Sequence, residues 1–248
     1  MKKTLITTIA VLLTAATQVG AVTVNVTEVS GYNPGQGGGE FNVNPVIGTG
    51  YSPSVIVGGG FETFCLSRNV GIIVPGTYNA TVNANSVYDF DNSTTKTMAK
   101  GTAYLYQQFA TGVLGGYRYG QTIGGTTSGR ATDAYNLQLA IWTLEGEYDY
   151  GSLAADLGNA FLTIAANMFG GGTAGLLAAM GANSAGGFGV GALNLTFANN
   201  IVVNGVVTVQ AGQKAQPLLV LLPDGGTTLM LMGIGFSSLA LISRKFRA

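Results

Sequence analysis

The residue types that most often carry out catalysis are scarce in this chain of 248 residues. It contains no histidine, which excludes Ser-His-Asp and Cys-His catalysis as well as metal sites built on imidazole ligands. It contains one cysteine, Cys65, so no disulfide can form within the chain. Cys65 is therefore the one thiol nucleophile of the sequence, and we expect neither a metal ion nor a cofactor.

A glutamine within a predicted helix, Gln138, is the second residue that could do chemistry. It shares a helix face with Ile141 and Trp142, because residues three and four positions apart are neighbours on a helix. Both apolar residues should point into the core, and Gln138 should then do the same. A buried amide without a partner costs on the order of 2 kcal/mol, so Gln138 must hydrogen-bond to another buried group.

Two short motifs around these residues resemble the thioester domains of bacterial surface adhesins. In that family a strand carries an aromatic-Cys-apolar-polar motif, which residues 64–67 match as Phe-Cys-Leu-Ser. A later segment carries an apolar residue and Gln and often ends in Ala-Ile-Trp, which residues 137–142 match as Leu-Gln-Leu-Ala-Ile-Trp. The resemblance implies a single extracellular domain, which we place at residues 22–215.

The resemblance also implies a specific reaction, in which the sulfur of Cys65 attacks the side-chain carbonyl of Gln138 and ammonia leaves. The product is an internal thioester that an amine or hydroxyl group of a partner surface can attack. Gln138 is then joined covalently to the partner and the thiol is released, so each molecule reacts once and the protein is not an enzyme. Such a bond survives where water is excluded, and Phe64, Trp142 and the aromatic residues of 104–109 are candidates for that cover.

Each of these residues also has an ordinary interpretation. A lone cysteine in an apolar strand is usually an inert core residue, and a glutamine on an amphipathic helix is usually solvated. A third candidate site is the acidic cluster of Glu145, Glu147 and Asp149, since paired carboxylates can serve a glycosidase. In residues 145–150 these acidic residues alternate with glycine and tyrosine, which is more typical of an exposed segment directly after a helix.

Alternating patterns predict the strands that must position these residues. The strands are expected at residues 22–27, 61–66 and 78–82. In the second of them Cys65 shares a face with Phe61 and Thr63, while Phe64 and Leu66 lie on the other face. A hairpin is expected at residues 201–209, because an Asn-Gly pair suits the two positive-φ positions of a type I′ turn.

Helical patterns occupy the middle of the chain. We expect helices at residues 101–110, 133–145 and 152–169. The second should begin at the capping residues Thr132 and Asp133 and stop at Gly146. The structure of the Gly/Ala-rich segment 170–189 is left open. Strands, then helices, then strands indicate an α+β fold, mainly antiparallel β (barrel or sandwich) with a small helical subdomain.

The N-terminus has the pattern of a secretory signal peptide at residues 1–21. Lys2 and Lys3 precede a short apolar run, and small residues end the segment at Ala21. We expect signal peptidase to cut after Ala21.

The C-terminus combines a short motif, an apolar segment and a basic end. The motif contains Leu222, Pro223, Asp224, Gly225 and Gly226, and the basic end contains Arg244, Lys245 and Arg247. The apolar segment between them is about as long as the shortest single transmembrane helices. The basic end would stay on the cytoplasmic side of the membrane.

This order of parts resembles the PEP-CTERM class of sorting signals, and the motif is closest to the variant that reads Val-Pro-Asp-Ser-Gly. The resemblance implies that an exosortase-like enzyme processes the tail at residues 223–248, which a short linker at 216–222 joins to the domain. The precursor would be anchored in the membrane and the product would lie at the cell surface or in the extracellular matrix. A permanent C-terminal anchor is the alternative for the tail.

The charge of the central region excludes one class of partner. Without residues 1–21 and 223–248 the chain has six basic and ten acidic side chains, a net charge of −4. Nucleic-acid binding needs a basic face to neutralise phosphates, so no nucleic acid is expected. Our first hypothesis is a sorted surface protein that attaches through Cys65 and Gln138. The alternatives are a matrix-associated structural protein without covalent chemistry, and a secreted glycan hydrolase.

Overall fold

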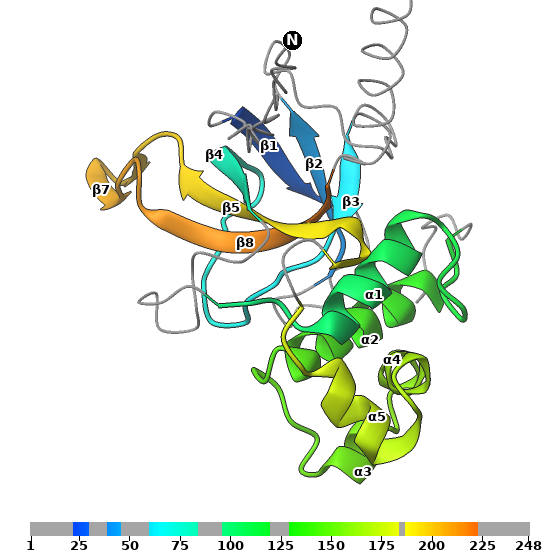
Figure 1. Ribbon diagram of the computed structural model, residues 1–248. Helices are drawn as coiled ribbons and strands as arrows, with labels where there is room; N and C mark the ends of the chain where they lie inside the picture. The colour runs from blue at the N-terminus through cyan, green and yellow to red at the C-terminus, as the bar shows by residue number, and fades with distance from the viewer. Residues whose placement is uncertain are drawn as a thin grey trace, which may run out of the picture.

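A curled antiparallel sheet and a group of helices below it make up this protein (Figure 1). The computed structural model describes residues 22–29, 39–45, 60–83, 96–119, 129–183 and 187–222. Within them the sheet has the form of a half-barrel, and the α+β class expected from the sequence is confirmed. The expected signal peptide and sorting tail lie outside the described residues, except for Leu222.

The main sheet has six strands in the order β3-β2-β1-β4-β5-β8, each antiparallel to its neighbours. Its strands are β1 (Val22–Glu28), β2 (Phe41–Pro45), β3 (Phe61–Thr63), β4 (Gly76–Asn83), β5 (Val190–Phe197) and β8 (Lys214–Leu221). Between β5 and β8 the chain makes a separate hairpin, β6 (Ile201–Val203) and β7 (Val206–Val209), which projects to the left in Figure 1.

The two edge strands of the sheet, β3 and β8, meet at Cys65. Main-chain hydrogen bonds of 2.9 and 3.1 Å link Leu66 and Phe64 to β8 on either side of it. Cys65 itself faces Leu218 in an isolated antiparallel bridge. The sheet therefore curls until its first and last strands are joined by a short ladder around Cys65 and Leu218, which we call the seam.

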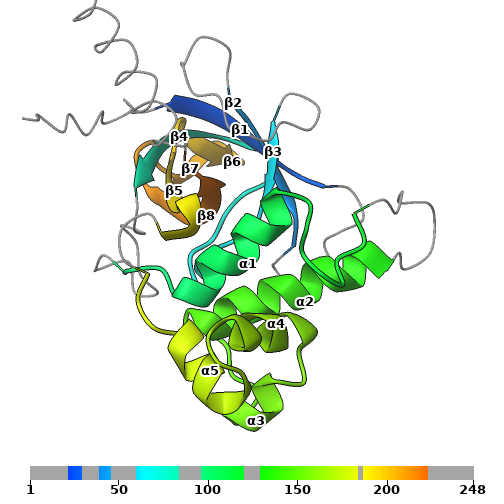
Figure 2. The same cartoon turned by 45° about the vertical axis from the view of Figure 1, so that its right-hand side comes forward.

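The helices form two layers below the sheet. They are α1 (Lys100–Ala110), α2 (Gly129–Leu144), α3 (Leu153–Asp156), α4 (Ala160–Met168) and α5 (Gly172–Ala179), followed by a 3-10 turn, η1 (Gly187–Gly189). Figures 1 and 2 show α1 and α2 next to the sheet, with α3 to α5 beyond them. Every residue of α2 from Leu137 to Leu144 is buried, as expected for a helix with apolar side chains on all faces.

The interior consists of two apolar clusters, and α2 contributes to both. One cluster fills the space among the helices and the adjoining face of the sheet, and it includes Phe64, Leu137 and Ile141. The other lies inside the curl of the sheet and contains Cys65 together with Trp142. Neighbouring residues of the strand after β3 thus enter different clusters, which confirms the alternation of faces expected from the sequence.

The expected strands and the hairpin are confirmed, with small differences at their ends. In the hairpin, Asn204 and Gly205 have φ angles of 51° and 78°, the pair of positive values that a type I′ turn requires. The strands β2, β5 and β8 were not expected. The proposed linker at 216–222 is wrong, because β8 continues to Leu221 and main-chain pairing holds it in the sheet.

Two helix predictions also need correction. The second helix begins at Gly129, and Asp133 does not cap it but accepts hydrogen bonds from Arg118. The single helix expected at 152–169 is two helices, since Asn159 interrupts the first and caps α4 by accepting from the amide of Phe161 at 2.9 Å. The segment left open at 170–189 contains α5.

Within the described residues, no single helix is long and apolar enough to cross a membrane. The helices α4 and α5 meet the length and composition criteria together, but they are bent by 85° at the break between them. The transmembrane helix expected in the C-terminal tail falls outside the residues that the structure describes.

We expect Asn159→Ala to lower the free energy of unfolding by on the order of 2 kcal/mol. The substitution removes the cap of α4 and also the hydrogen bonds from the Asn159 amide to the Asn136 oxygen and the Tyr150 hydroxyl. Ser152→Ala is the matched control, because Ser152 caps the four-residue helix α3 at an exposed position. Urea unfolding of both variants checks this, and equal losses would contradict it.

Candidate functional site

The structure brings together the two residues on which the reactive-site hypothesis depends. The amide of Cys65 donates to Oε1 of Gln138 at 2.9 Å, and Nε2 of Gln138 donates to the carbonyl oxygen of Cys65 at 2.8 Å. Both residues are completely buried, although 73 positions separate them in the chain. The Gln138 side chain is thus held against the main chain of the residue that carries the thiol.

The position of this contact follows from the hydrogen bonding of the sheet. In the seam the residues on either side of Cys65 bond to β8, so the N–H and C=O of Cys65 point away from β8. On that side β2 pairs with β3 as far as Phe41 opposite Thr63. The carboxamide of Gln138 takes the place of the next strand residue and satisfies both main-chain groups, which would otherwise be buried without partners.

The α2 residues next to Gln138 exclude water from the sulfur. Leu139 and Trp142 belong to the same apolar cluster as Cys65. The indole N–H of Trp142 is buried and has no hydrogen-bond partner among the described residues. Trp142 is therefore the member of the expected aromatic cover that shares a cluster with the thiol.

The rest of the expected cover is placed elsewhere. Phe64 points to the opposite face of the strand and packs edge-on against Phe109 of α1, with ring centroids 4.9 Å apart. The expectation that Phe64 and the α1 aromatic residues cover the sulfur is therefore wrong, because alternation along the strand turns neighbouring side chains to opposite faces.

An arginine lies over the outer side of this cluster. The guanidinium carbon of Arg68 is 5.9 Å from the ring centroid of Trp142 and 5.1 Å from that of Tyr148, within the range of cation–π contacts. Arg68 is itself exposed. The Cys65–Gln138 pair is thus separated from solvent on this side by two aromatic rings and the charged side chain of Arg68.

The environment of the sulfur contains a second buried amide that sequence reasoning missed. Gln216 of β8 is buried, and its side-chain nitrogen donates to the carbonyl oxygen of Ser67. Burial raises the pKa of the Cys65 thiol well above its usual value, the Gln216 amide opposes this rise, and the charge of Glu147 adds to it. The thiol is therefore protonated in the folded protein at neutral pH.

The acidic cluster after α2 has a structural role in this arrangement. Glu145 accepts from the amide of Ala99 at 3.0 Å, and Glu147 accepts from Ser67 Oγ at 3.2 Å and from the amide of Arg68. The exposed fractions of the two carboxylate side chains are 2% and 4%. The expectation of an exposed helix exit is wrong for Glu145 and Glu147, because both fasten the end of α2 to neighbouring segments.

The two carboxylates share one cation, with Lys96 Nζ at 3.9 Å from Glu145 and 3.6 Å from Glu147. Burial raises the pKa of Glu145 to about 7, against opposing contributions that include the Ala99 amide and Lys96. Asp149, the third member of the cluster, accepts from the amide of Gly151 at 2.6 Å in a turn. Both carboxylates are buried and share Lys96, which fits a structural contact rather than a pair that flanks a sugar.

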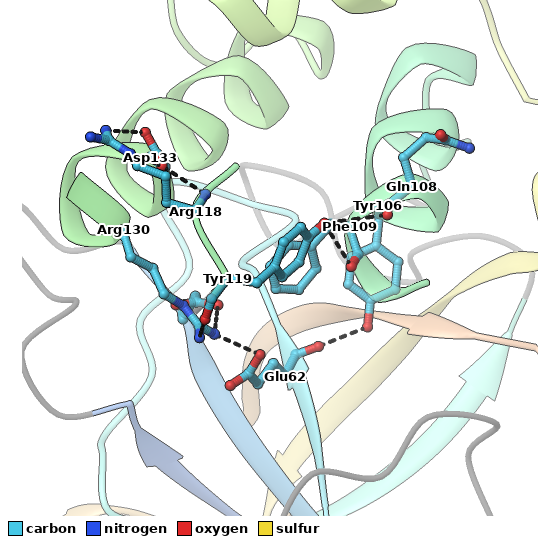
Figure 3. A network of polar contacts seen from close by, with 9 residues as sticks. Glu62, Tyr106, Gln108, Phe109, Arg118, Tyr119, Arg130 and Asp133 are labelled. Carbon is cyan, nitrogen blue, oxygen red and sulfur yellow. Dashed lines mark hydrogen bonds and ion pairs between the residues drawn. The ribbon is translucent and has the colours of Figure 1, made fainter. Parts of the chain in front are cut away.

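The start of α2 is fastened to the sheet by a second charged network. Arg130 donates to both oxygens of Glu40 at 3.0 and 2.8 Å and to Glu62 at 2.8 Å. It also donates to the carbonyl oxygen of Tyr119 at 2.6 Å. Figure 3 shows Arg130 reaching between Tyr119 and Glu62, while Tyr106 of α1 contacts the main chain of Glu62.

Burial shapes the protonation of this network. It raises the pKa of Glu40 even though Arg130 acts in the other direction. It also raises the pKa of the Tyr117 phenol, and the charge of Glu40 adds to that rise. For Arg130, the carboxylates outweigh the opposing effect of burial and raise its pKa, so the arginine stays charged.

Of the expected sorting motif, the structure describes Leu222, whose amide donates to the Gly189 carbonyl oxygen at 2.7 Å. The other residues of that motif, the basic end and the expected cleavage point after Ala21 lie outside the described residues. In the described part of the chain, no three histidine, cysteine, aspartate or glutamate side chains are grouped so that they could hold a metal ion. Comparisons with protein-family models, with curated protein sequences and with solved structures found no match for this chain.

We expect the stability of the protein to fall as pH rises from about 4.5 to about 7, and Glu145 to account for part of this fall. In this interval the folded protein keeps the Glu145 proton that the unfolded chain has lost, so raising the pH favours unfolding. Glu145→Gln should reduce the fall by on the order of 2 kcal/mol. Urea unfolding of the two proteins across this range measures it. The pKa of Glu40 is raised as well, but Glu40 is present in both proteins. If the free energy of unfolding falls equally steeply with pH in the wild type and in Glu145→Gln, the assignment to Glu145 is refuted.

We expect Arg130→Leu to lower the free energy of unfolding by on the order of 3 kcal/mol, because it leaves Glu40 buried without its cation. Arg118→Leu is the matched control. Arg118 makes a similar two-pronged contact with Asp133, but half of its side chain is exposed, so water can replace it. Thermal unfolding of both variants checks the difference, and a smaller loss for Arg130→Leu would contradict it.

Proposed function

We propose that this chain is an exported surface protein that attaches covalently to a partner through an internal thioester between Cys65 and Gln138. The observation that carries the proposal is the pair of hydrogen bonds that hold the Gln138 carboxamide on the main chain of Cys65. Any buried group could satisfy those main-chain atoms. Here the group is a carboxamide, the one neutral side-chain type that a thiol can convert to an acyl group by expelling ammonia.

Bond formation needs no external reagent. The sulfur of Cys65 adds to the Gln138 carbonyl carbon, the carbon–nitrogen bond breaks, and the thiol proton leaves with the amide nitrogen as ammonia. An incoming amine then adds to the same carbon, the carbon–sulfur bond breaks, and the proton of the amine returns to sulfur. A hydroxyl group would react in the same way and give an ester.

The contacts support each part of this reaction. The Cys65 amide already donates to Oε1 of Gln138, the oxygen on which negative charge develops when the carbon becomes tetrahedral. The Cys65 carbonyl oxygen accepts from Nε2, the atom that leaves, and it would accept equally from an amine that arrives there. Complete burial of both residues keeps the thioester from water.

The remaining parts of the proposal concern the setting of this bond. Cleavage after Ala21 would make Val22, the first residue of β1, the first residue of the exported domain. The motif at 222–226 would begin directly after β8, so the tail would leave the domain where β8 ends beside the start of β5. We take the half-barrel joined at the seam to be a barrel rather than a sandwich. The partners are then signal peptidase, an exosortase-like enzyme and an amine- or hydroxyl-bearing surface.

The intact mass of the exported protein tests the proposal. We expect a mass lower than that of the sequence by one ammonia molecule, a full mass for Cys65→Ala and for Gln138→Met, and mass addition by methylamine in the wild type alone. The reason is that both atoms of the bond come from these two side chains. A wild-type protein of full mass, with a thiol that iodoacetamide alkylates under native conditions, would show that no thioester forms.

That negative outcome would favour the second hypothesis, a matrix-associated structural protein with the same export. One feature of the structure suits it independently of the thioester. The β6–β7 hairpin exposes four valines, Val202, Val203, Val206 and Val207, an apolar surface that a protein in an assembled matrix could cover.

A further inference from the structure

The strand and the helix that carry the proposed bond reach the surface at one place. The two residues that follow Cys65 are buried, and the third, Arg68, is exposed. In and after α2 the buried stretch that contains Gln138 is continuous until exposure returns at Gly146. The carboxylate of Glu147 accepts from the main-chain amide of Arg68 and so joins these two ends. Solvent therefore comes nearest to the pair, along both segments, beside Arg68.

The side chain of Arg68 lies over Trp142, which is one helical turn after Gln138. The guanidinium carbon is 5.9 Å from the ring centroid of Trp142 and 5.1 Å from that of Tyr148. Trp142 is only 3% exposed and belongs to the apolar cluster that contains Cys65. The indole ring thus covers that cluster, and we call this its closed position.

The head of Arg68 is held weakly, although its main chain is held firmly. Within the parts of the chain that the structure describes, Arg68 forms no ion pair. Its guanidinium donates to the carbonyl oxygen of Glu147 at 3.5 Å, the long limit for a hydrogen bond. Exposed side chains change rotamer in picoseconds to nanoseconds. The cation can therefore leave the two rings without any movement of the strand.

The ring of Trp142 is held by packing and not by a hydrogen bond. Its N–H is buried and has no partner among the described residues, whereas the N–H of a buried tryptophan usually has one. A buried donor without a partner is destabilising, and a ring that turns outward gives this N–H to water. The cation over the ring opposes that turn, because it is attracted to the face of the indole. Arg68 thus stabilises the closed position.

We infer that Arg68 determines which nucleophiles reach the proposed thioester, because it holds Trp142 in the closed position. The inference rests on the proposed function and assigns a specificity residue of the same site. Arg68 acts through the indole ring and not on the reacting atoms, so it is a positioning residue. A small displacement of the ring admits a small nucleophile, whereas a large one needs the cation removed. A partner surface that binds the exposed guanidinium removes it and opens the way to Gln138.

The test compares Arg68→Met with Arg68→Lys and with Arg118→Met in the full exported chain. Methionine keeps an unbranched apolar side chain and removes the charge, whereas lysine retains a cation. Arg118→Met is the matched control, because it also removes a partly exposed arginine, whose guanidinium binds Asp133. The nucleophiles are hydroxylamine and the larger O-benzylhydroxylamine. Both are largely uncharged at neutral pH, so a change in the charge of the protein does not itself attract or repel them.

In Arg68→Met we expect hydroxylamine to open the thioester roughly threefold faster, the effect of one cation–π contact at an exposed site. The larger probe should gain more, so the ratio of the two rates should move toward one. Arg68→Lys should lie close to the wild type, and Arg118→Met should match it. A purely structural role of Arg68 would instead speed both probes in proportion to a loss in the free energy of unfolding, measured in urea, and that result would contradict the inference.

A second readout does not need the thioester, because Trp142 is the only tryptophan of the chain. We expect acrylamide to quench its fluorescence more strongly in Arg68→Met than in the wild type and the other two variants. Unchanged quenching, or an unchanged ratio of the two opening rates, would overturn the inference while the thioester stands. A wild type of full mass would remove the proposed function, and the quenching would then decide by itself whether Arg68 holds Trp142 closed.

Discussion

The two hydrogen bonds between Gln138 and the main chain of Cys65 are the constraint on which the arrangement of sheet and helices depends. The sheet ends its β2–β3 pairing at Phe41 and leaves the N–H and C=O of Cys65 facing the helices. Both groups are buried, and each would cost on the order of 2 kcal/mol without a partner. The carboxamide of Gln138 in α2 removes this cost by binding both groups. The same two bonds fix how close α2 lies to the sheet and which of its faces points toward Cys65.

Two charged networks hold the same helix at its ends. Arg130 joins its first turn to Glu40 and Glu62, next to β2 and in β3. After its last turn, Glu147 binds the segment at Ser67 and Arg68 that follows the seam. The middle of α2 is therefore placed against Cys65 by contacts on both sides. Displacement of the helix would require the separation of buried charges, which is far more costly than the loss of a surface ion pair.

This rigidity has a consequence for the chemistry that the site can support. A thioester between a strand and a helix links two elements that must not move apart before the bond forms, and must not admit water afterwards. Burial alone disfavours a thiolate, as the raised pKa of Cys65 shows. A hydrogen-bond donor on the carbonyl oxygen, here the Cys65 amide, is the physical means by which a dry site can still carry charge in a transition state.

The sequence by itself determined several of the elements and indicated Cys65 and Gln138 as a candidate pair. Alternation of apolar residues gave the strands around Val24, Phe61 and Tyr78, and an Asn-Gly pair gave the hairpin. The inward direction of Gln138 followed from its spacing to Ile141 and Trp142, because local periodicity depends on the backbone geometry of one element. The absence of histidine restricted the chemistry before any fold was known.

Tertiary structure alone decided how these elements meet. The closure of the sheet at Cys65, the replacement of a β2 residue by Gln138 and the hydrogen bond from Gln216 to Ser67 all depend on contacts between segments more than 70 positions apart. No local pattern marks Gln216, which looks like a linker residue beside a proline. No local pattern shows that Glu145 and Glu147 are buried either. Their burial depends on partners that are distant in the sequence, namely Lys96 for both carboxylates and the main-chain amide of Ala99 for Glu145.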